Sequence, residues 1–173
     1  MKKLLILFCF ISFQSIFSQN ILDFDLKNVE LQGMKPAKIN QELKSIGISQ
    51  NPFVTENPDI ISKIDQRENS ALIKKMYTFM YNNPKGSDGG VVINQFANKN
   101  DLDAYLAETF EQSNYRIFVK NLFLIRVWSD YSLHVKGKET SEDHLNKLEK
   151  YYTNLGAKRF TLKVDESIIT VVQ

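Results

Sequence analysis

Val91-Val92-Ile93-Asn94-Gln95-Phe96-Ala97 opens the part of the chain that decides the fold, which continues to Val164. This β-branched run follows the glycine pair Gly89-Gly90, and the combination is typical of a strand after a turn. The residues from Asn98 to Asp101 then carry amide and carboxylate groups that can cap a helix. The apolar face expected for that helix consists of Leu102, Tyr105, Leu106, Thr109 and Phe110.

Two further strands are predicted, from Tyr115 to Val119 and from Leu122 to Ser129. We expect Lys120-Asn121 to form the hairpin turn between them, because asparagine tolerates the left-handed backbone conformation that such turns require. Ser141 can cap a second helix, which Gly156 is well placed to end. The apolar stripe of this helix consists of Leu145, Leu148, Tyr152 and Leu155.

A last strand is predicted from Arg159 to Asp165, where apolar and polar residues alternate. The order strand, helix, strand, strand, helix, strand predicts an α+β fold with a ferredoxin-like βαββαβ core over about residues 91–165. Residues 166–173 are expected to form an extra edge strand. That strand would pair back on the fourth strand, and an exposed edge there could also mediate self-association.

The segment in front of the core, residues 59–82, is expected to be helical and to cover part of the sheet. Over residues 70–81 the apolar residues that fall within one arc of a helical wheel are Leu72, Ile73, Met76, Phe79 and Met80. The alternative is a strand here, which would pair with Val91–Ala97 and change the order of elements to ββαββα. Residues 19–58 are interpreted as an N-terminal arm and linker before one α+β domain of residues 59–173.

Residues 1–18 have the layout of a secretory signal peptide, in which Met1-Lys2-Lys3 precedes an apolar run and a stretch of small and polar residues. The apolar run is shorter than the about 20 residues that cross a bilayer. We therefore expect cleavage near Ser18 and no stable membrane span in the mature chain, and an uncleaved anchor is the alternative. Abundant Lys, Asn and Ile with few Arg suggest a bacterial source, so the predicted location is periplasmic or secreted.

Composition and charge restrict the chemistry of the mature chain. Cys9 is the only cysteine and lies in the leader, so no disulfide, thiolate nucleophile or cysteine-based metal site is expected. Loss of Lys2 and Lys3 with the leader reduces the 22 basic residues to 20, which equals the 20 acidic residues. A chain without net charge is not attracted to nucleic acid, and that partner is not expected. No catalytic residue, metal or cofactor is predicted.

The third predicted strand has two faces, because successive side chains point to opposite sides of a sheet. Phe123, Ile125 and Val127 are expected to face the helices. The candidate ligand-binding residues on the outer face are Asn94, Phe96, Arg116, Phe118, Arg126 and Trp128. Its three aromatic side chains could present an apolar area of roughly 450–750 Å², compared with roughly 300–600 Å² for the largest apolar patch of a typical monomer. Either residues 70–81 or the N-terminal arm cover this face, or it binds a ligand or partner.

His134 and His144 lie near three carboxylates in the sequence, those of Asp130, Glu139 and Asp143. A histidine beside a carboxylate can form an acid–base pair or a zinc site. The spacing matches no established metal signature. This group therefore supports only the alternative of a small hydrolase that uses His134 or His144.

Two segments of the core resemble the SPOR domains of bacterial envelope proteins. Phe96-Ala97-Asn98-Lys99 leads into its helix like the end of their first strand, and Leu122 to Val127 takes the place of their third. Asn94-Gln95 departs from their glycine-containing turn, and Trp128-Ser129-Asp130 from their Gly-Pro-type ending. SPOR domains are small βαββαβ modules that bind peptidoglycan glycan strands, so the resemblance implies glycan binding on the outer sheet face.

The compartment, the architecture and the lack of a catalytic signature together predict an exported, non-enzymatic binding or accessory module. Its expected partner is cell-wall glycan or an envelope protein. The SPOR-like glycan-binding module and the small hydrolase are the two alternatives.

Overall fold

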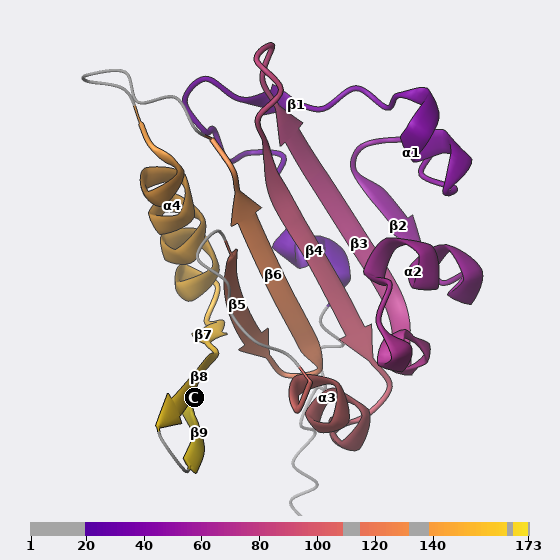
Figure 1. Cartoon of the computed structure of the whole chain (residues 1–173), viewed down its shortest axis with the longest axis vertical. Helices are drawn as coiled ribbons and strands as arrows, with labels where there is room; N and C mark the ends of the chain where they lie inside the picture. Colours follow the sequence, from indigo (N-terminus) through magenta and orange to yellow (C-terminus); the bar gives the residue numbers. More distant parts are fainter. Residues whose placement is uncertain (1–19, 109–114, 132–138, 166–167, 173) are drawn as a thin grey trace, which may run out of the picture.

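The computed structural model describes residues 20–108, 115–131, 139–165 and 168–172, and for residues 161–165 and 168–172 it describes the backbone alone. The protein is a mixed α+β structure built on an antiparallel sheet of seven strands (Figure 1). The centre of the sheet has the spatial order β3 (Ile73–Asn82), β4 (Asp88–Phe96), β6 (Phe123–Ser129) and β5 (Tyr115–Lys120).

Short strands protect both edges of this sheet. They are β1 (Lys35–Pro36) and β2 (Phe53–Thr55), which pair with β3, and β7 (Lys158–Arg159), which pairs with β5. Between β1 and β2, the side chain of Asn51 donates to the carbonyl oxygen of Met80 at 2.8 Å and accepts from its N–H at 3.0 Å. One side chain thus takes the place of a strand residue along β3.

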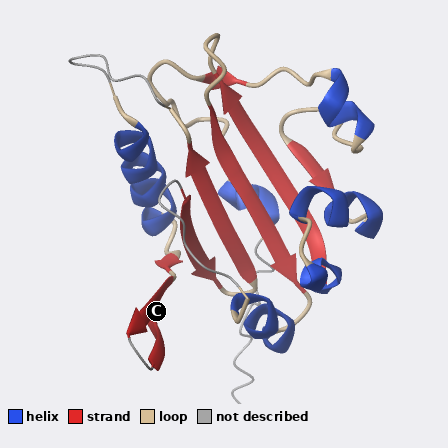
Figure 2. Ribbon diagram, viewed as in Figure 1, coloured by secondary structure: helices blue, strands red, loops and turns tan. Residues whose placement is uncertain are grey.

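Helices cover both faces of the sheet (Figure 2). The elements on the first face are α2 (Pro58–Asp65), the 3₁₀ helix η2 (Glu68–Leu72) and α3 (Lys99–Leu106). Those on the second face are the 3₁₀ helix η1 (Ile21–Phe24) and α4 (Ser141–Asn154). The remaining helix, α1 (Gln41–Ser45), buries none of its residues.

Two separate apolar cores result from this arrangement. On the second face Phe123, Ile125 and Val127 pack in one cluster with Leu145 and Leu148 of α4. The residues of the other cluster include Leu124, Phe96, Leu102 of α3 and Ile61 of α2. Because neighbouring residues of a strand point to opposite faces, the sheet needs both helical layers. The expectation that both core helices lie on one face is therefore wrong.

The helix predicted over residues 70–81 is also wrong, because residues 73–82 form β3. The strand alternative is confirmed: β3 pairs antiparallel with β4, from Ile73 opposite Phe96 to Asn82 opposite Asp88. Both faces of β3 are covered, so buried residues do not alternate with exposed ones along it, and a helical wheel can also group them. Within the segment 59–82 that was expected to be helical, helical structure is limited to α2, which ends at Asp65, and η2, which ends at Leu72.

The last predicted strand is divided in the structure. Lys158–Arg159 forms β7 of the main sheet, whereas β8 (Thr161–Asp165) pairs with β9 (Ile168–Val172) in a separate two-stranded sheet. The prediction that the tail pairs back on the preceding strand is confirmed. The position beside β4 is occupied by β3, which comes from the N-terminal side of the chain.

The segment interpreted as an N-terminal arm packs into the second core, where Ile21, Phe24 and Leu26 are buried. Tyrosine hydroxyls hold its backbone. Tyr81 donates to the carbonyl oxygen of Leu26 at 3.0 Å, and Tyr152 donates to that of Phe24 at 3.0 Å. This strip of chain is consequently a structural part of the layer that contains α4.

Candidate functional site

The six candidate ligand-binding residues divide between the two faces of the sheet. Phe118 lies opposite Ile125 and Arg116 opposite Val127, and directly opposed residues of antiparallel strands share a face. The turn between the strands contains Asn121, with a φ of 51°, and Leu122, so Lys120 is opposite Phe123. The turn lies one residue later than predicted.

Arg116 and Phe118 therefore face α4, and their assignment to the outer face is wrong. Arg116 bonds to two carboxylates of α4, to Glu149 at 3.1 Å and to Glu142 at 2.5 Å. Phe118 packs on Tyr152 with ring centroids 6.0 Å apart. Both side chains attach α4 to the sheet.

The other four residues, Asn94, Phe96, Arg126 and Trp128, do share a face, but α2, η2 and α3 cover it. Asn94 and Phe96 are each only 1% exposed. Arg126 and Trp128 keep part of their surface. Two of the covering elements, α2 and η2, fall almost entirely within residues 59–82, the segment expected to cover part of the sheet, whereas α3 was expected on the other face. Neither residues 70–81 as a helix nor the N-terminal arm provides the cover.

A buried polar cluster around Asp65 joins this helical layer to the sheet. The hydroxyl of Tyr105 donates to the Asp65 carboxylate, 2.8 and 2.9 Å from its two oxygens, and accepts from the Asn94 amide at 3.2 Å. The guanidinium of Arg126 lies 3.2 Å from the same carboxylate. Burial, together with the Asp65 charge, raises the pKa of Tyr105 far above its ordinary value. These groups connect α2, α3, β4 and β6 through a charged link.

Of the two histidines of the hydrolase alternative, His134 lies outside the described residues, and His144 lies in α4. His144 is 0% exposed. Its Nδ1 lies 3.3 Å from the hydroxyl of Ser129, and its Nε2 lies 3.1 Å from the carbonyl oxygen of Gln32 and 3.3 Å from Glu139. The serine, histidine and carboxylate of a nucleophilic site are present, but Ser129 is also 0% exposed and closed to a substrate.

The carboxylates near the histidines have structural partners. Asp143 accepts from the N–H of Thr140 at 2.8 Å and caps α4, and Asp130 accepts from the N–H of Asp88. Glu139 accepts from the N–H of Gln32 at 3.0 Å and pairs with Lys147. The Glu139 contacts join the start of α4 to the N-terminal strip, and the Asp130 contact joins the end of β6 to the start of β4.

We expect His144 to make folding stability depend on pH. Burial lowers the pKa of His144 below its ordinary 6.5, although Glu139 acts in the opposite direction. The unfolded chain then binds a proton more readily than the folded one, so this contribution is fully present above about pH 6.5 and is lost as the pH falls through the folded-state pKa. Urea unfolding between pH 7.5 and pH 5 measures the loss.

In the His144→Gln variant that pH dependence should disappear. His134→Gln, measured in parallel, reports what the other histidine contributes. The pKa of the nearby Asp143 lies below its ordinary value because its carboxylate accepts hydrogen bonds from Thr140. The pKa of Glu139 is also lowered, because its bonds to Lys147 and Gln32 outweigh the effect of burial. Both carboxylates therefore titrate at a lower pH than His144. An unchanged slope in His144→Gln would contradict the assignment.

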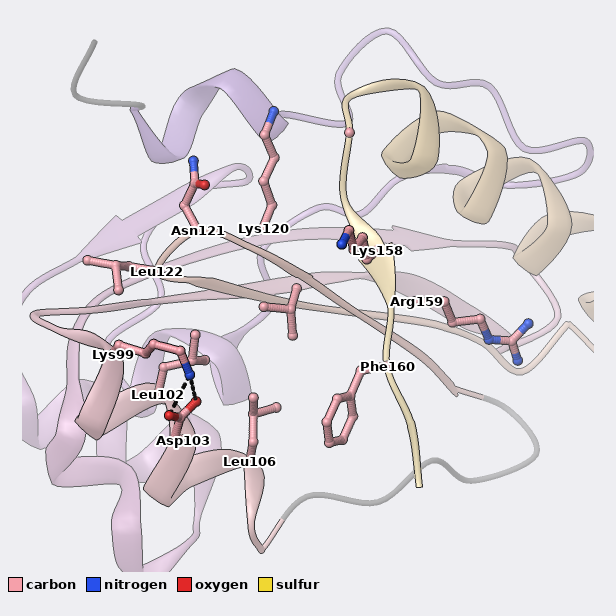
Figure 3. Close-up of a pocket in the computed structure, with 12 residues that line it drawn as sticks. Lys99, Leu102, Asp103, Leu106, Lys120, Asn121, Leu122, Lys158, Arg159 and Phe160 are labelled. Carbon is pink, nitrogen blue, oxygen red and sulfur yellow. Dashed lines mark hydrogen bonds and ion pairs between the residues drawn. The ribbon is translucent and has the colours of Figure 1, made fainter. Parts of the chain in front are cut away.

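A groove of about 490 Å³ lies between α3, the turn after β5 and the chain around β7 (Figure 3). Its apolar floor consists of Leu102, Leu106, Val119, Leu122 and Phe160. Figure 3 shows Leu106 of α3 and Phe160, the residue that follows β7, side by side at the centre of the groove. The volume falls within the roughly 300–1,000 Å³ of small-ligand sites.

The rim of the groove is positively charged. Its cations are Lys99, Lys120, Lys158 and Arg159, and its one carboxylate, Asp103, lies 2.6 Å from the ammonium of Lys99. The ammonium of Lys120 donates to the carbonyl oxygen of Leu155. Arg159 lies 3.0 Å from Glu149. Lys158 is exposed. Lys99 pairs with Asp103 on the rim, and Lys120 and Arg159 have contacts outside the groove, so Lys158 is the cation best placed to meet a ligand charge.

A second hollow, about 630 Å³ in volume, lies along the N-terminal strip beside Tyr81. Its charges balance, because Lys27 and Lys147 line it together with Glu30 and Glu139. Lys147 and Glu139 also pair with each other. The groove beside α3 therefore has the stronger preference for one sign of charge.

The sequence did not predict this groove, because three distant segments form it. One local signal was present: Leu122 is an apolar residue within a tight turn, where polar residues are usual. An apolar residue in such a turn indicates that something packs against the turn.

Comparison of this chain with models of protein families, with curated proteins and with solved structures finds no match in any of the three. Within the described ranges, no group of three or more His, Cys, Asp or Glu side chains could hold a metal ion. No helix among the same residues is both long enough and apolar enough to cross a bilayer.

Proposed function

We propose that this protein is an exported, non-enzymatic binding module whose groove holds an acidic peptide segment with apolar side chains. The observation that carries the proposal is the groove itself, in which an apolar floor lies under a rim of four cations and one neutralised carboxylate. Such a site gains affinity from burial of apolar side chains and orientation from charge.

The kinds of side chain that line the groove favour a peptide ligand over a sugar. Phe160 is the one aromatic residue among those that line the groove, and it is only 2% exposed, so no free ring is offered for stacking on a sugar. The SPOR-like alternative would need an open sheet face, whereas two apolar cores cover both faces of the described sheet. An acidic segment of an envelope protein is accordingly the partner that we propose.

Export is proposed from the leader, and the structure beside the expected cleavage position is compatible with it. Asn20 caps η1 through its side chain, which accepts from the N–H of Leu22 at 3.0 Å, and Ile21 is buried. Cleavage near Ser18 would leave this anchored strip intact.

For the fold we propose a ferredoxin-like core in which β3 holds the position of the fourth strand. The core departs from the ferredoxin-like arrangement in that α3 and α4 lie on opposite faces of the sheet.

A short synthetic peptide in which leucine and glutamate alternate should bind the protein, and a peptide of leucine and lysine should not. Lys158→Glu should weaken binding about tenfold, or about 1.4 kcal/mol, because it reverses the charge at the rim. Added salt should weaken binding further. Fluorescence anisotropy of the labelled peptides measures all three effects.

Lys150→Glu is the matched control, since Lys150 is an exposed lysine of α4 outside the groove. It changes the net charge by the same amount and should leave the affinity nearly unchanged. Equal binding of both peptides, or equal loss in both variants, would show that the attraction is non-specific and would refute the proposed site.

A further inference from the structure

We infer that the groove recognises a single carboxylate through Lys158, so that the peptide it prefers needs only one acidic residue among its apolar side chains. The inference rests on the proposed function, because it names the charge of the ligand that the same groove takes. The four cations that line the groove differ in the face of the sheet on which they lie and in what they already contact.

Two of these cations, Lys120 and Arg159, lie on the second face of the sheet, the face that α4 covers. Lys120 is opposite Phe123 in the β5–β6 pair. Arg159 is opposite Phe118 in the β5–β7 pair. Both phenylalanines belong to the apolar core that contains α4, and directly opposed residues share a face. Figure 3 shows the side chains of Lys120 and Arg159 pointing away from Phe160 on the groove floor.

On the second face, both cations help to hold α4. The ammonium of Lys120 donates to the carbonyl oxygen of Leu155 at the C-terminal end of α4, and it lies 5.7 Å from the centre of the Phe24 ring. The guanidinium of Arg159 lies 3.0 Å from the carboxylate of Glu149. The carbonyl end of a helix and a carboxylate both favour a cation. A ligand in the groove would have to draw these two cations away from contacts that stabilise the fold.

Lys158 lies on the first face, together with the groove floor. It is opposite Val119, which in turn is opposite Leu124. These two apolar residues belong to the core that contains α3, and so does Phe160, two residues after Lys158. Because Lys158 is exposed, its ammonium can meet the charge of a ligand whose apolar side chains lie on the floor.

The fourth cation, Lys99, is neutralised within the groove lining. Its ammonium lies 2.6 Å from the carboxylate of Asp103, one turn further along α3. Such an i,i+4 pair of opposite charges adds no net charge to the wall of the groove. Among the residues that line the groove, Lys158 therefore provides the positive charge on the side of the apolar floor. A second ligand carboxylate there would lose water without gaining a cation, which is unfavourable.

A series of peptides, measured on residues 19–173 by fluorescence anisotropy, counts the carboxylates that the groove recognises. The series consists of the alternating leucine–glutamate peptide, the same peptide with glutamine in place of all but one glutamate, and the peptide with glutamine in place of every glutamate. The single-glutamate peptide should bind within about twofold of the first, and the glutamine peptide about fivefold more weakly, the effect of one exposed ion pair.

Lys158→Gln should weaken binding of the single-glutamate peptide about fivefold and leave the affinity for the glutamine peptide nearly unchanged, which is the signature of a direct pair in a double-mutant cycle. Lys120→Gln and Arg159→Gln are the matched controls, because each removes one positive charge from the lining of the same groove. Both should keep the affinity within about twofold. Both should also lower the thermal unfolding temperature, since they lose the contacts to Leu155 and Glu149.

Circular dichroism checks that each variant is folded at the temperature of the binding measurement. Equal losses of affinity in the three variants, an unchanged affinity in Lys158→Gln, or a single-glutamate peptide that binds no better than the glutamine peptide would each overturn the inference. The proposed function stands in those cases if the wild type still binds the leucine–glutamate peptide and not the leucine–lysine peptide. If the wild type binds none of the acidic peptides, the proposed function fails and the inference fails with it.

Discussion

Replacing Gly90 with alanine is expected to destabilise the protein by about 3 kcal/mol, the upper end of the usual cost of overpacking a core. A Cβ at this position would lie 2.2 Å from the carbonyl oxygen of Phe79 and 2.8 Å from the indole of Trp128. Gly90 lies directly opposite Trp128 in the β4–β6 pair. The added methyl group would therefore separate strands at the centre of the sheet. Urea unfolding followed by circular dichroism measures the loss.

Gly86→Ala is the control for the backbone contribution. Gly86 has a φ of +92°, and an added Cβ would meet nothing within 4 Å. Its cost should be limited to the conformational strain of about 1–2 kcal/mol. If Gly90→Ala costs no more than Gly86→Ala, the close contact between Trp128 and β4 is wrong. The indole N–H of Trp128 also donates to the carboxylate of Asp88 at 2.7 Å, which holds the ring over this part of β4.

Replacing Asp65 with alanine is expected to cost about 3–5 kcal/mol, as does removing one partner of a buried ion pair. The substitution leaves the guanidinium of Arg126 and the hydroxyl of Tyr105 without their carboxylate in a site where the Asp65 side chain is 0% exposed. Asp65→Asn should cost less, because its amide oxygen can still accept from Tyr105. Thermal and urea unfolding distinguish the two variants.

Asp103→Ala serves as the control, since it removes an aspartate whose side chain is 49% exposed and which pairs with Lys99 within α3. An exposed pair of this kind contributes little to stability. Similar losses in Asp65→Ala and Asp103→Ala would contradict the view that the buried cluster joins α2 and α3 to the sheet.

Local signals in the sequence predicted most of the elements from residue 91 onward. Asn98 caps α3 by accepting from the N–H of Asp101 at 3.0 Å, as its position indicated. α4 begins at Ser141, its predicted cap, and so one residue earlier than predicted, because Thr140 takes the capping role. It ends before Gly156, which has a φ of +83°. These features depend on a few neighbouring residues, which explains why they could be read from the chain.

The errors concern features set by residues far apart in the sequence. β3 was mistaken for a helix because its two covered faces remove the alternation that identifies a strand. Arg116 and Phe118 were assigned to the wrong face because a shift of one residue in a turn reverses the side on which every residue of a strand points. The sequences of α3 and α4 do not indicate that the two helices lie on opposite faces, because the sheet offers an apolar surface on both sides.

The candidate site shows the same division. Of the predicted face, Asn94 and Arg126 do meet in one cluster, but through Asp65 and Tyr105, which come from segments that the sequence did not bring together. The groove is formed by residues 99–106, 119–122 and 156–160, and no single segment has a binding signature. Only packing brings its floor and its charges into one place.

The central claim is that this protein binds partners in the groove beside α3. The most direct test is a titration of the isotope-labelled protein with the leucine–glutamate peptide, followed through its backbone amide NMR signals. We predict that the largest shifts occur in the three groove segments, with Leu106, Leu122 and Lys158 among them. Shifts centred instead on Arg126 and Trp128, the exposed part of the covered sheet face, would contradict the account.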